Sequence, residues 1–188
     1  MSGSETFTAF EGTSRLQSGV LADVALAVKR AEGRSAQPIA IFSDATGRAI
    51  DLDLRGSDAE IVARLPHEQP IQPRGRGRPK LGVVAREVTL LPRHWEWLNA
   101  QPGGASVALR KLVDAARRAN GDSDRSRAAR DAAYHFMSAM AGNLPDFEEA
   151  SRALFADDRA KLNSLIAGWP GDISDHIVRL FRADEAAC

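Results

Sequence analysis

The chain has 188 residues, of which 44% are apolar and 27% charged, a composition typical of a globular protein with one or two domains and not of a disordered one. Its 25 cations and 25 anions cancel, so the net charge by itself gives no indication of a nucleic-acid partner. No apolar run reaches the roughly 18 residues that a membrane span needs, the first residues lack a signal-peptide pattern, and the single cysteine, Cys188, excludes a disulfide within the chain.

The first 70 residues predict a small α+β lobe. Two β-prone stretches, Pro38–Ser43 and Ala49–Leu54, flank a turn at Asp44–Gly47 and are typical of a β-hairpin. Three further elements are expected around this hairpin: a strand at Glu5–Phe10, a helix at Val20–Arg30 that Gly33 ends, and a helix that Ser57 caps.

Two carboxylates, Asp51 and Asp53, lie two residues apart on one face of the second hairpin strand. Such a pair can form a metal site or a paired-carboxylate site. Ile50, Leu52 and Leu54 alternate with them, which favours the simpler interpretation of a half-buried strand whose other face is solvated.

A basic tract follows at residues 71–82. Its central eight residues, 73–80, include four cations and no acid. Gly77 places no side chain between the backbone and a surface, and Pro79 favours an extended course at Arg78. Such a peptide suits the minor groove of A·T-rich DNA, which is narrow, has a strong negative potential and lacks the guanine amino group.

The residues Arg76-Gly77-Arg78-Pro79 resemble the core of an AT-hook. The resemblance implies that this core, Pro79 included, lies in the minor groove with Arg76 and Arg78 inserted, and that two flanking cations, Arg74 and Lys80, contact phosphate. A tract rich in arginine, glycine and proline is also typical of a solvated interdomain linker, so both interpretations stand.

Charge is distributed unevenly along the chain. Residues 71–118 carry ten Lys or Arg against three Asp or Glu, whereas residues 1–70 carry seven against ten and residues 119–188 eight against twelve. Because phosphate contacts respond to local charge and not to the net charge of the protein, this basic middle segment indicates a nucleic-acid partner.

Residues 83–120 predict one strand followed by two helices. The run Val83–Pro92 is β-prone, a helix is expected over Arg93–Gln101, and a second helix over Ala105–Arg118 after the break at Pro102–Gly104. A segment of this length with a single strand buries too little core alone, so the economical solution is a homodimer whose strands pair across a twofold axis.

This segment resembles a ribbon-helix-helix DNA-binding unit. The resemblance implies that the paired strands enter the major groove with an outward face of Ala85, Glu87 and Thr89. It also implies that the turn before the second helix holds phosphate through Gly103, Gly104 and Ser106.

Two residues depart from the ribbon-helix-helix pattern. Glu87 is a carboxylate where the family usually offers a neutral or basic side chain, and it can accept only from the cytosine amino group, while Arg86 occupies an inward phase. An ordinary αα-hairpin is the alternative, with Trp95, Trp97 and Leu98 as its core or as a packing face for the flanking domains.

The last part of the chain, residues 121–188, predicts a C-terminal helical lobe. Its helices are expected over Asp124–Ala141, Pro145–Phe155, Asp157–Ala167 and Asp172–Phe181. We expect this lobe to serve in packing or dimerisation.

No catalytic motif is present in the sequence. The nucleophile turn Gly-x-Ser-x-Gly, the phosphate loop, the dinucleotide fingerprint and the zinc motif His-Glu-x-x-His are all absent. Four histidines stand in separate segments without metal-like spacing: His67, His94, His135 and His176. We therefore predict no enzyme activity, no metal site and no cofactor.

Over nearly its whole length the chain resembles an uncharacterised bacterial family, the domain of unknown function DUF2239. The text that carries the resemblance is Gly-Arg-Gly-Arg-Pro-Lys at residues 75–80 and Glu-Val-Thr-Leu-Leu-Pro-Arg-His-Trp-Glu-Trp-Leu at residues 87–98. The resemblance implies a bacterial cytoplasmic protein and brings no activity or site with it.

The sequence thus predicts an α+β protein with four parts: an N-terminal lobe (1–70), a basic linker (71–82), a ribbon-helix-helix-like segment (83–120) and a helical lobe (121–188). Its predicted function is DNA binding as a homodimer, in transcription regulation or at the nucleoid, without a membrane partner. Two alternatives remain open. One is an RNA-associated protein, and the other is a protein-interaction adaptor in which the basic tract is only a linker.

Overall fold

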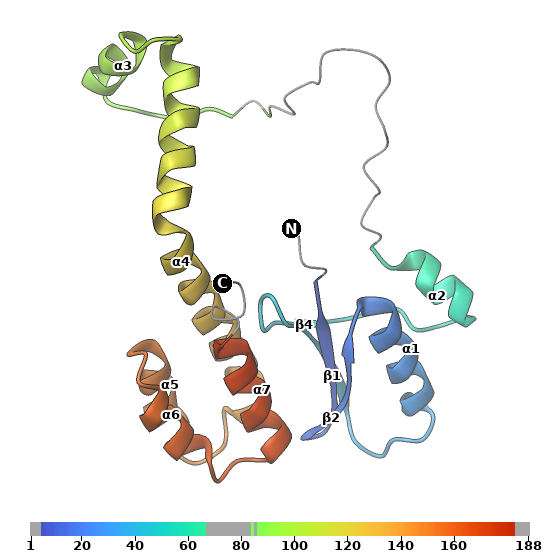
Figure 1. Ribbon diagram of the computed structural model, residues 1–188. Helices are drawn as coiled ribbons and strands as arrows, with labels where there is room; N and C mark the ends of the chain where they lie inside the picture. The colour runs from blue at the N-terminus through green and yellow to red at the C-terminus, as the bar shows by residue number, and fades with distance from the viewer. Residues whose placement is uncertain (1–4, 67–83, 85, 183–188) are drawn as a thin grey trace. The chain divides into compact units, whose positions relative to one another are not determined.

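The computed structural model describes residues 5–66, 84 and 86–182, and the chain divides into two compact units (Figure 1). The first unit consists of Met1–Pro66 and Asp122–Cys188, and the second of His67–Gly121. The predicted α+β class is confirmed. The elements of the described residues are β1 (Phe7–Glu11), β2 (Ser14–Gly19), α1 (Leu21–Glu32), β3 (Ile39–Ser43), β4 (Ala49–Ile50), α2 (Asp58–Arg64), α3 (Pro92–Asn99), α4 (Gly104–Ala141), α5 (Phe147–Phe155), α6 (Arg159–Ile166) and α7 (Gly171–Phe181).

The strands form one antiparallel sheet in the order β2-β1-β3-β4. Every residue of β1 pairs with β3, and the register places Phe10 opposite Ala40. Strand β2 escapes prediction because its sequence, Ser-Arg-Leu-Gln-Ser-Gly, has one apolar residue, so tertiary pairing with β1 decides its conformation.

One face of the sheet packs against α1. Side chains alternate across the strands, so Phe7 and Ala9 of β1 point to this face together with Ile41 of β3. Val24 and Val28 of α1 close the same small core. This helix ends at Gly33, as the sequence predicts.

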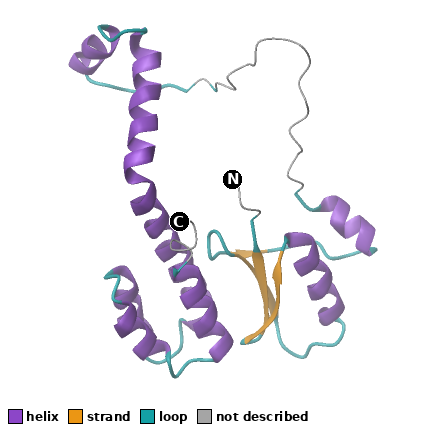
Figure 2. Ribbon diagram, viewed as in Figure 1, coloured by secondary structure: helices purple, strands orange, loops and turns teal. Residues whose placement is uncertain are grey.

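The opposite face of the sheet packs against helices from the C-terminal part of the chain (Figure 2). Phe10 and Phe42 meet Phe136 of α4, with ring centroids 5.1 and 4.9 Å apart. Ile173 and Ile177 of α7 belong to the same cluster. This is the larger of the two cores of the first unit.

The N-terminal and C-terminal segments, which the sequence assigns to separate lobes, therefore lie in one unit with a shared core. Each segment alone would leave an apolar face uncovered: the sheet at Phe10 and Phe42, and the helices at Phe136 and Ile177. Periodicity shows that these faces exist but does not show which element covers which.

Gly47 fixes the turn between β3 and β4 against α4. Its φ of 64° lies in the left-handed region, and a Cβ at this position would meet the carbonyl oxygen of Ala132 at 1.8 Å. No residue with a side chain fits here without movement of the backbone. The predicted turn at Asp44–Gly47 thus also holds the sheet in place on the helix.

Several helix ends follow from local capping. The capping box at Ser57 is present, with the hydroxyl accepting from the Glu60 amide and the Glu60 carboxylate accepting from the Ser57 amide. Helices α5, α6 and α7 coincide with predicted helices to within two residues at each end.

Helix α4 is longer than predicted. The sequence predicts two helices with a break near Gly121, but the structure has one helix of 38 residues from Gly104 to Ala141. The predicted boundary between residues 120 and 121 therefore falls inside a helix. A glycine within a helix costs only about 1 kcal/mol relative to alanine, and here the helix continues through it.

Strand β4 is shorter than predicted. The expected strand Ala49–Leu54 pairs with β3 only at Ala49 and Ile50, and the chain leaves the sheet at Asp51. Leu52 and Leu54 still pack on the core beneath α1. The alternating pattern therefore reports burial correctly, although the residues after Ile50 form no ladder.

Candidate nucleic-acid interface and other polar sites

The predicted hook residues, namely Arg74, Arg76, Gly77, Arg78, Pro79 and Lys80, lie outside the described residues. The structure does describe the other predicted DNA contacts, Thr89, Gly104 and Ser106. These belong to the second unit.

Thr89 is exposed and lies in a stretch that forms no strand in the single chain. The described residues from Arg86 to Leu91 have no secondary structure, and helix α3 begins directly afterwards at Pro92. A ribbon strand needs a partner strand for its backbone groups, and the described part of the single chain offers none to these residues. Strand pairing at this point thus remains a prediction about a dimer.

Gly104 and Ser106 lie at the start of α4, as the predicted phosphate-holding turn requires. Gly103 and Gly104 have φ values of 88° and 74°, which explains why two glycines stand at the entry to α4. Ser106 is exposed in the first helical turn, where backbone amides have no partner within the helix. Phosphate contact by Gly104 and Ser106 stays a prediction, and Thr89 has no shown relation to them.

Helix α3 buries little of its surface. Leu98 is buried and Trp95 half-buried, whereas Trp97 is 53% exposed. Among the described residues of the second unit, only Leu98 and Ala108 count as buried apolar residues. The αα-hairpin alternative, in which these side chains form a core or a packing face for the flanking domains, therefore stays open, with Leu98 buried and Trp97 exposed.

The described cations of the second unit are unpaired. There are six of these described cations, and they lie in α3, in α4 and in the residues before α3: Arg86, Arg93, Arg110, Lys111, Arg117 and Arg118. None of their side chains makes an ion pair or hydrogen bond to another described residue. In the first unit, by contrast, thirteen of the fifteen cationic side chains do.

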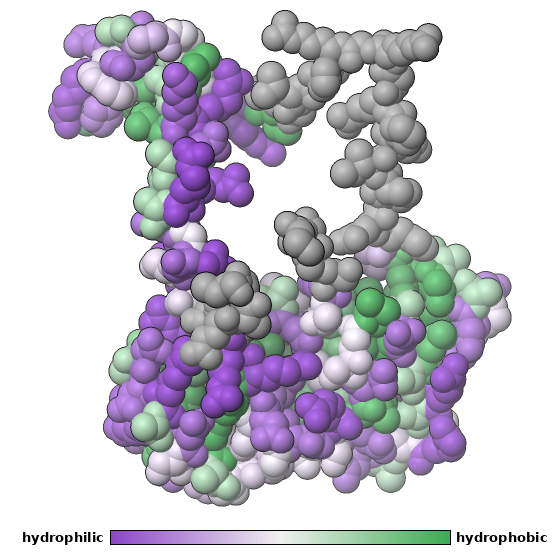
Figure 3. Space-filling view, viewed as in Figure 1, coloured by the Kyte–Doolittle hydropathy of each residue, from purple (hydrophilic) through white to green (hydrophobic). Residues whose placement is uncertain are grey.

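In the first half of α4 the cations lie away from the leucines to different degrees. At about 100° per residue, Lys111 and Arg118 fall opposite Leu109. Arg110 and Arg117 lie nearer the apolar side, about 60° and 40° from Val113. Figure 3 shows hydrophilic and hydrophobic side chains next to each other at the surface of this part of α4. The first half of α4 is thus an amphipathic helix whose charged side is free for a partner.

The first unit contains a buried polar cluster that sequence reasoning missed. Thr8 is fully buried on β1, and its hydroxyl donates to Oδ1 of Asp44 at 2.8 Å. Arg179 of α7 donates to the Thr8 hydroxyl at 2.6 Å and to Oδ2 of Asp44 at 3.0 Å. The cluster therefore ties α7 to the sheet through an ion pair and two hydrogen bonds.

His176 is the fourth member of this cluster and is fully buried. Arg179 lies 3.1 Å from its Nδ1, and because a guanidinium only donates, Nδ1 must accept and the neutral ring carries its proton on Nε2. That Nε2 lies 3.6 Å from Oδ1 of Asp44 and has no hydrogen-bond partner among the described residues. Burial, followed by the charge of Arg179, lowers the pKa of His176 to about 4, although the Asp44 carboxylate acts in the opposite direction.

The cluster is best explained by packing. His176 is fully buried and stacks edge-on against Phe136, with ring centroids 4.4 Å apart. The sequence does carry a signal for its burial, because His176 lies on the apolar side of its helix with Ile173 and Leu180. His176 is thus a packing residue of the core that the sheet shares with α4 and α7.

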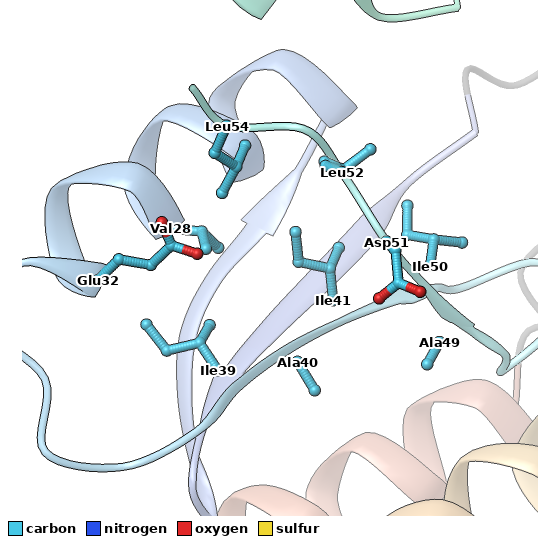
Figure 4. A pocket seen from close by; sticks show the side chains of 10 residues that line it. All are labelled: Val28, Glu32, Ile39, Ala40, Ile41, Ala49, Ile50, Asp51, Leu52 and Leu54. Carbon is cyan, nitrogen blue, oxygen red and sulfur yellow. The ribbon is translucent and has the colours of Figure 1, made fainter. Parts of the chain in front are cut away.

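A pocket lies beside α1, where the chain leaves the sheet after Ile50 of β4 (Figure 4). Its volume is about 170 Å³, and Val28, Ile41 and Leu54 line it together with the exposed carboxylates of Glu32 and Asp51. Asp53 does not share the pocket and instead forms an ion pair with Arg55, which holds the pKa of that carboxyl below its usual range. The two aspartates therefore do not form the paired-carboxylate site that their spacing allowed.

No group of three His, Cys, Asp or Glu side chains in residues 5–66, 84 and 86–182 could hold a metal ion. Within the same residues, every helix is too short or too polar to span a bilayer.

Comparisons with known proteins give one match. No curated protein and no solved structure matches the chain. The family described as an uncharacterized protein conserved in bacteria, DUF2239, matches residues 6–181, which include both units almost completely. The chain therefore belongs to this bacterial family.

Proposed function

We propose that this protein binds double-stranded DNA through the second unit, as a transcription regulator or a nucleoid-associated protein. The observation that carries the proposal is the set of unpaired cations in this unit. A cation that already pairs with a carboxylate must exchange that partner for phosphate, whereas an unpaired one is free to neutralise a phosphate and release its counterion.

The division of charge between the units supports the same proposal. His67–Gly121 carries ten Lys or Arg against four Asp or Glu, whereas the rest of the chain carries fifteen against twenty-one. Such separation is typical of proteins in which one region attracts a polyanion and the other does not.

In this proposal the hook, residues 74–80, gives the protein its preference for A·T-rich DNA. In this proposal Arg76 and Arg78 enter the minor groove, Gly77 keeps the backbone close to the groove floor, and Lys80 contacts phosphate. Arg110, Arg117 and Arg118 add phosphate contacts from α4. The protein acts as a homodimer, which doubles the number of these contacts.

Trp97 supports a second candidate, binding of single-stranded RNA. Its ring is 53% exposed beside unpaired cations, and an exposed indole can stack on an unpaired base. Stacking on a single strand does not depend on groove width. The two candidates therefore differ in the nucleic acid that they prefer and in the role of the hook.

Competition binding with an A·T-rich duplex, a G·C-rich duplex and a single-stranded RNA tests both candidates. We expect the A·T-rich duplex to bind most tightly, and Arg78→Ala and Gly77→Val to reduce the ratio of A·T-rich to G·C-rich affinity. Arg78→Lys should restore only part of it, because lysine is more strongly hydrated and lacks the planar fork.

Trp97→Ala is the matched variant for the RNA candidate. It should leave duplex affinity unchanged and lower RNA affinity only if the indole stacks on a base. An unchanged A·T-rich to G·C-rich ratio in both Arg78→Ala and Gly77→Val would reduce the hook to a linker. Absence of binding to all three nucleic acids at low salt would leave the adaptor alternative.

A further inference from the structure

The pocket beside α1 opens where the ladder between β3 and β4 stops. The register pairs Ile41 with Ile50, so the next residues to pair would be Ile39 and Leu52. Among the described residues no hydrogen bond joins Ile39 to Leu52. The two segments separate at this point, and both line the pocket of about 170 Å³ (Figure 4).

Aliphatic side chains make most of the pocket lining. The larger ones are Val28 of α1, Ile39 and Ile41 of β3, and Leu52 and Leu54 of the segment after β4. No aromatic ring and no cation is among the lining residues. Because each methylene group that leaves water adds to affinity, this lining favours a ligand with an alkyl chain.

The two polar lining residues are the exposed carboxylates Glu32 and Asp51. Figure 4 shows them at opposite sides of the pocket, with the aliphatic side chains between them. Neither carboxylate makes an ion pair or hydrogen bond to another described residue, and the cations of α1, Lys29 and Arg30, pair with Asp58 instead. The pocket therefore offers an uncompensated negative charge at each end.

Ile39 adds a backbone acceptor to the pocket. The amide of Ser43 donates to the carbonyl of Arg48 at 3.0 Å, and alternate residues of a strand turn their backbone groups to the same side. Ile41 and Ile39 therefore turn theirs towards β4, where only Ile41 has a ladder partner. The carbonyl oxygen of Ile39 is thus available to a donor in the pocket.

We propose that this pocket binds an aliphatic diamine, which is an alkyl chain with an ammonium group at each end. Each ammonium group pairs with one carboxylate, and the chain lies on the aliphatic side chains. An ammonium group has three donors, so the Ile39 carbonyl can accept a bond that a carboxylate leaves over. Since a cavity of about 150 Å³ holds benzene, the pocket has room for a chain of about four to six carbons.

Other ligand classes match fewer features of the pocket. An anion would meet two carboxylates and no cation, and a neutral alkyl chain would leave both charges unpaired. One metal ion cannot contact carboxylates at opposite sides of the pocket, and the described residues contain no group of three metal-binding side chains. A monoamine, such as a lysine side chain of another protein, neutralises only one end.

The test compares three probes of equal chain length, titrated into the full chain at low ionic strength because salt screens exposed ion pairs. Cadaverine is a five-carbon diamine, pentylamine lacks one of its ammonium groups, and the corresponding diol lacks both. Cadaverine should bind at least about twofold more tightly than pentylamine, and the diol should bind most weakly. In nuclear magnetic resonance spectra, the amide signals of Ile39 and Leu52 should shift with cadaverine.

Glu32→Gln and Asp51→Asn remove one charged end each and should each weaken cadaverine binding by about two- to fivefold. The double variant should lose the preference for cadaverine over the diol. Asp23→Asn is the matched control, because Asp23 is an exposed carboxylate of α1 outside the pocket, and it should bind cadaverine as wild type does. Circular dichroism shows that each variant is folded.

A second measurement follows the melting temperature. Cadaverine should raise it in wild type and in Asp23→Asn but not in the double variant, because a ligand stabilises the folded state that binds it.

Several results would overturn the inference. Equal affinities of cadaverine and pentylamine, or a loss in only one of the two single variants, would show a site for one amine. An equal loss in Asp23→Asn would show general attraction to an acidic surface, and no binding of cadaverine at millimolar concentration would leave the pocket without this ligand. The inference concerns the first unit alone, so none of these results bears on DNA binding by the second.

Discussion

The two units use the same residue types in opposite ways. In the first, apolar residues fill two cores and thirteen of fifteen cations have a partner within the unit. In the second, only Leu98 and Ala108 among the described apolar residues are buried, and none of the six described cations has a partner in the described part. The first unit satisfies its own side chains, and the second keeps them available for another molecule.

The largest expected contrast concerns aromatic side chains. Phe136→Ala should lower the free energy of unfolding by about 3 to 5 kcal/mol, because this ring is fully buried between Phe10, Phe42 and His176. Trp97→Ala, in the second unit, should change it by less than about 0.5 kcal/mol, since half of the indole is already in water. Urea denaturation checks both, and a similar loss in the two variants would mean that the second unit has a core of its own.

Acid should destabilise the first unit through His176. Its folded pKa of about 4 lies below the ordinary value of 6.5, so between these pH values the unfolded chain binds more protons than the folded one. The stability that this group contributes is complete above about pH 7 and is lost as the pH falls towards 4, by up to about 3 kcal/mol.

His176→Gln supplies the control, because glutamine does not titrate. Denaturation of both proteins from pH 4 to pH 8 should show a pH-dependent difference that is confined to the acid side. Parallel profiles would show that His176 does not change its charge between the folded and unfolded states in this range.

A glycine pair tests how closely the sheet is held on α4. Gly47→Ala should cost more than about 1 kcal/mol, because the residue has a positive φ and its new methyl group would meet the Ala132 carbonyl. Gly33→Ala is the matched control, since Gly33 has a φ of −74° and open space around it. It should be neutral or slightly stabilising, and equal melting temperatures for the two variants would contradict the close contact at Gly47.

The smallest effect distinguishes paired from unpaired cations. Arg117→Gln should reduce the salt dependence of duplex binding by about one phosphate, a change of roughly 0.9 in the slope of log affinity against log salt. Arg152→Gln should leave that slope unchanged, because Arg152 pairs with Glu149 in the first unit. Equal slopes for wild type and Arg117→Gln would remove α4 from the phosphate contacts.

The sequence predicts single elements of this fold better than their assembly. The helix ends at Gly33 and Ser57 depend on neighbouring residues, and they are confirmed. Strand β2 and the shared core depend on contacts between distant segments, and no local pattern contains them. The sequence predicts separate helices over Ala105–Arg118 and Asp124–Ala141, yet a glycine between them, Gly121, costs too little to end α4.

The candidate sites show the same difference between what local sequence predicts and what depends on contacts between distant residues. Local composition identified the basic middle of the chain, and the structure adds that its described cations are unpaired. The cluster of Thr8, Asp44 and Arg179 was not predicted, because its members stand up to 171 positions apart. Their meeting is a property of the shared core and not of any motif.

The shared core also determines when the first unit can finish folding during synthesis at the ribosome. Phe10 and Phe42 leave the exit tunnel early, but their cover from α4 and α7 follows only after the whole second unit has been made. At about 5 to 20 residues per second, more than one hundred residues of delay leaves one face of the nascent sheet bare for roughly ten seconds. During that interval the exposed phenylalanines are a binding site for chaperones, and cellular yield should depend on them more than the stability of the finished fold would suggest.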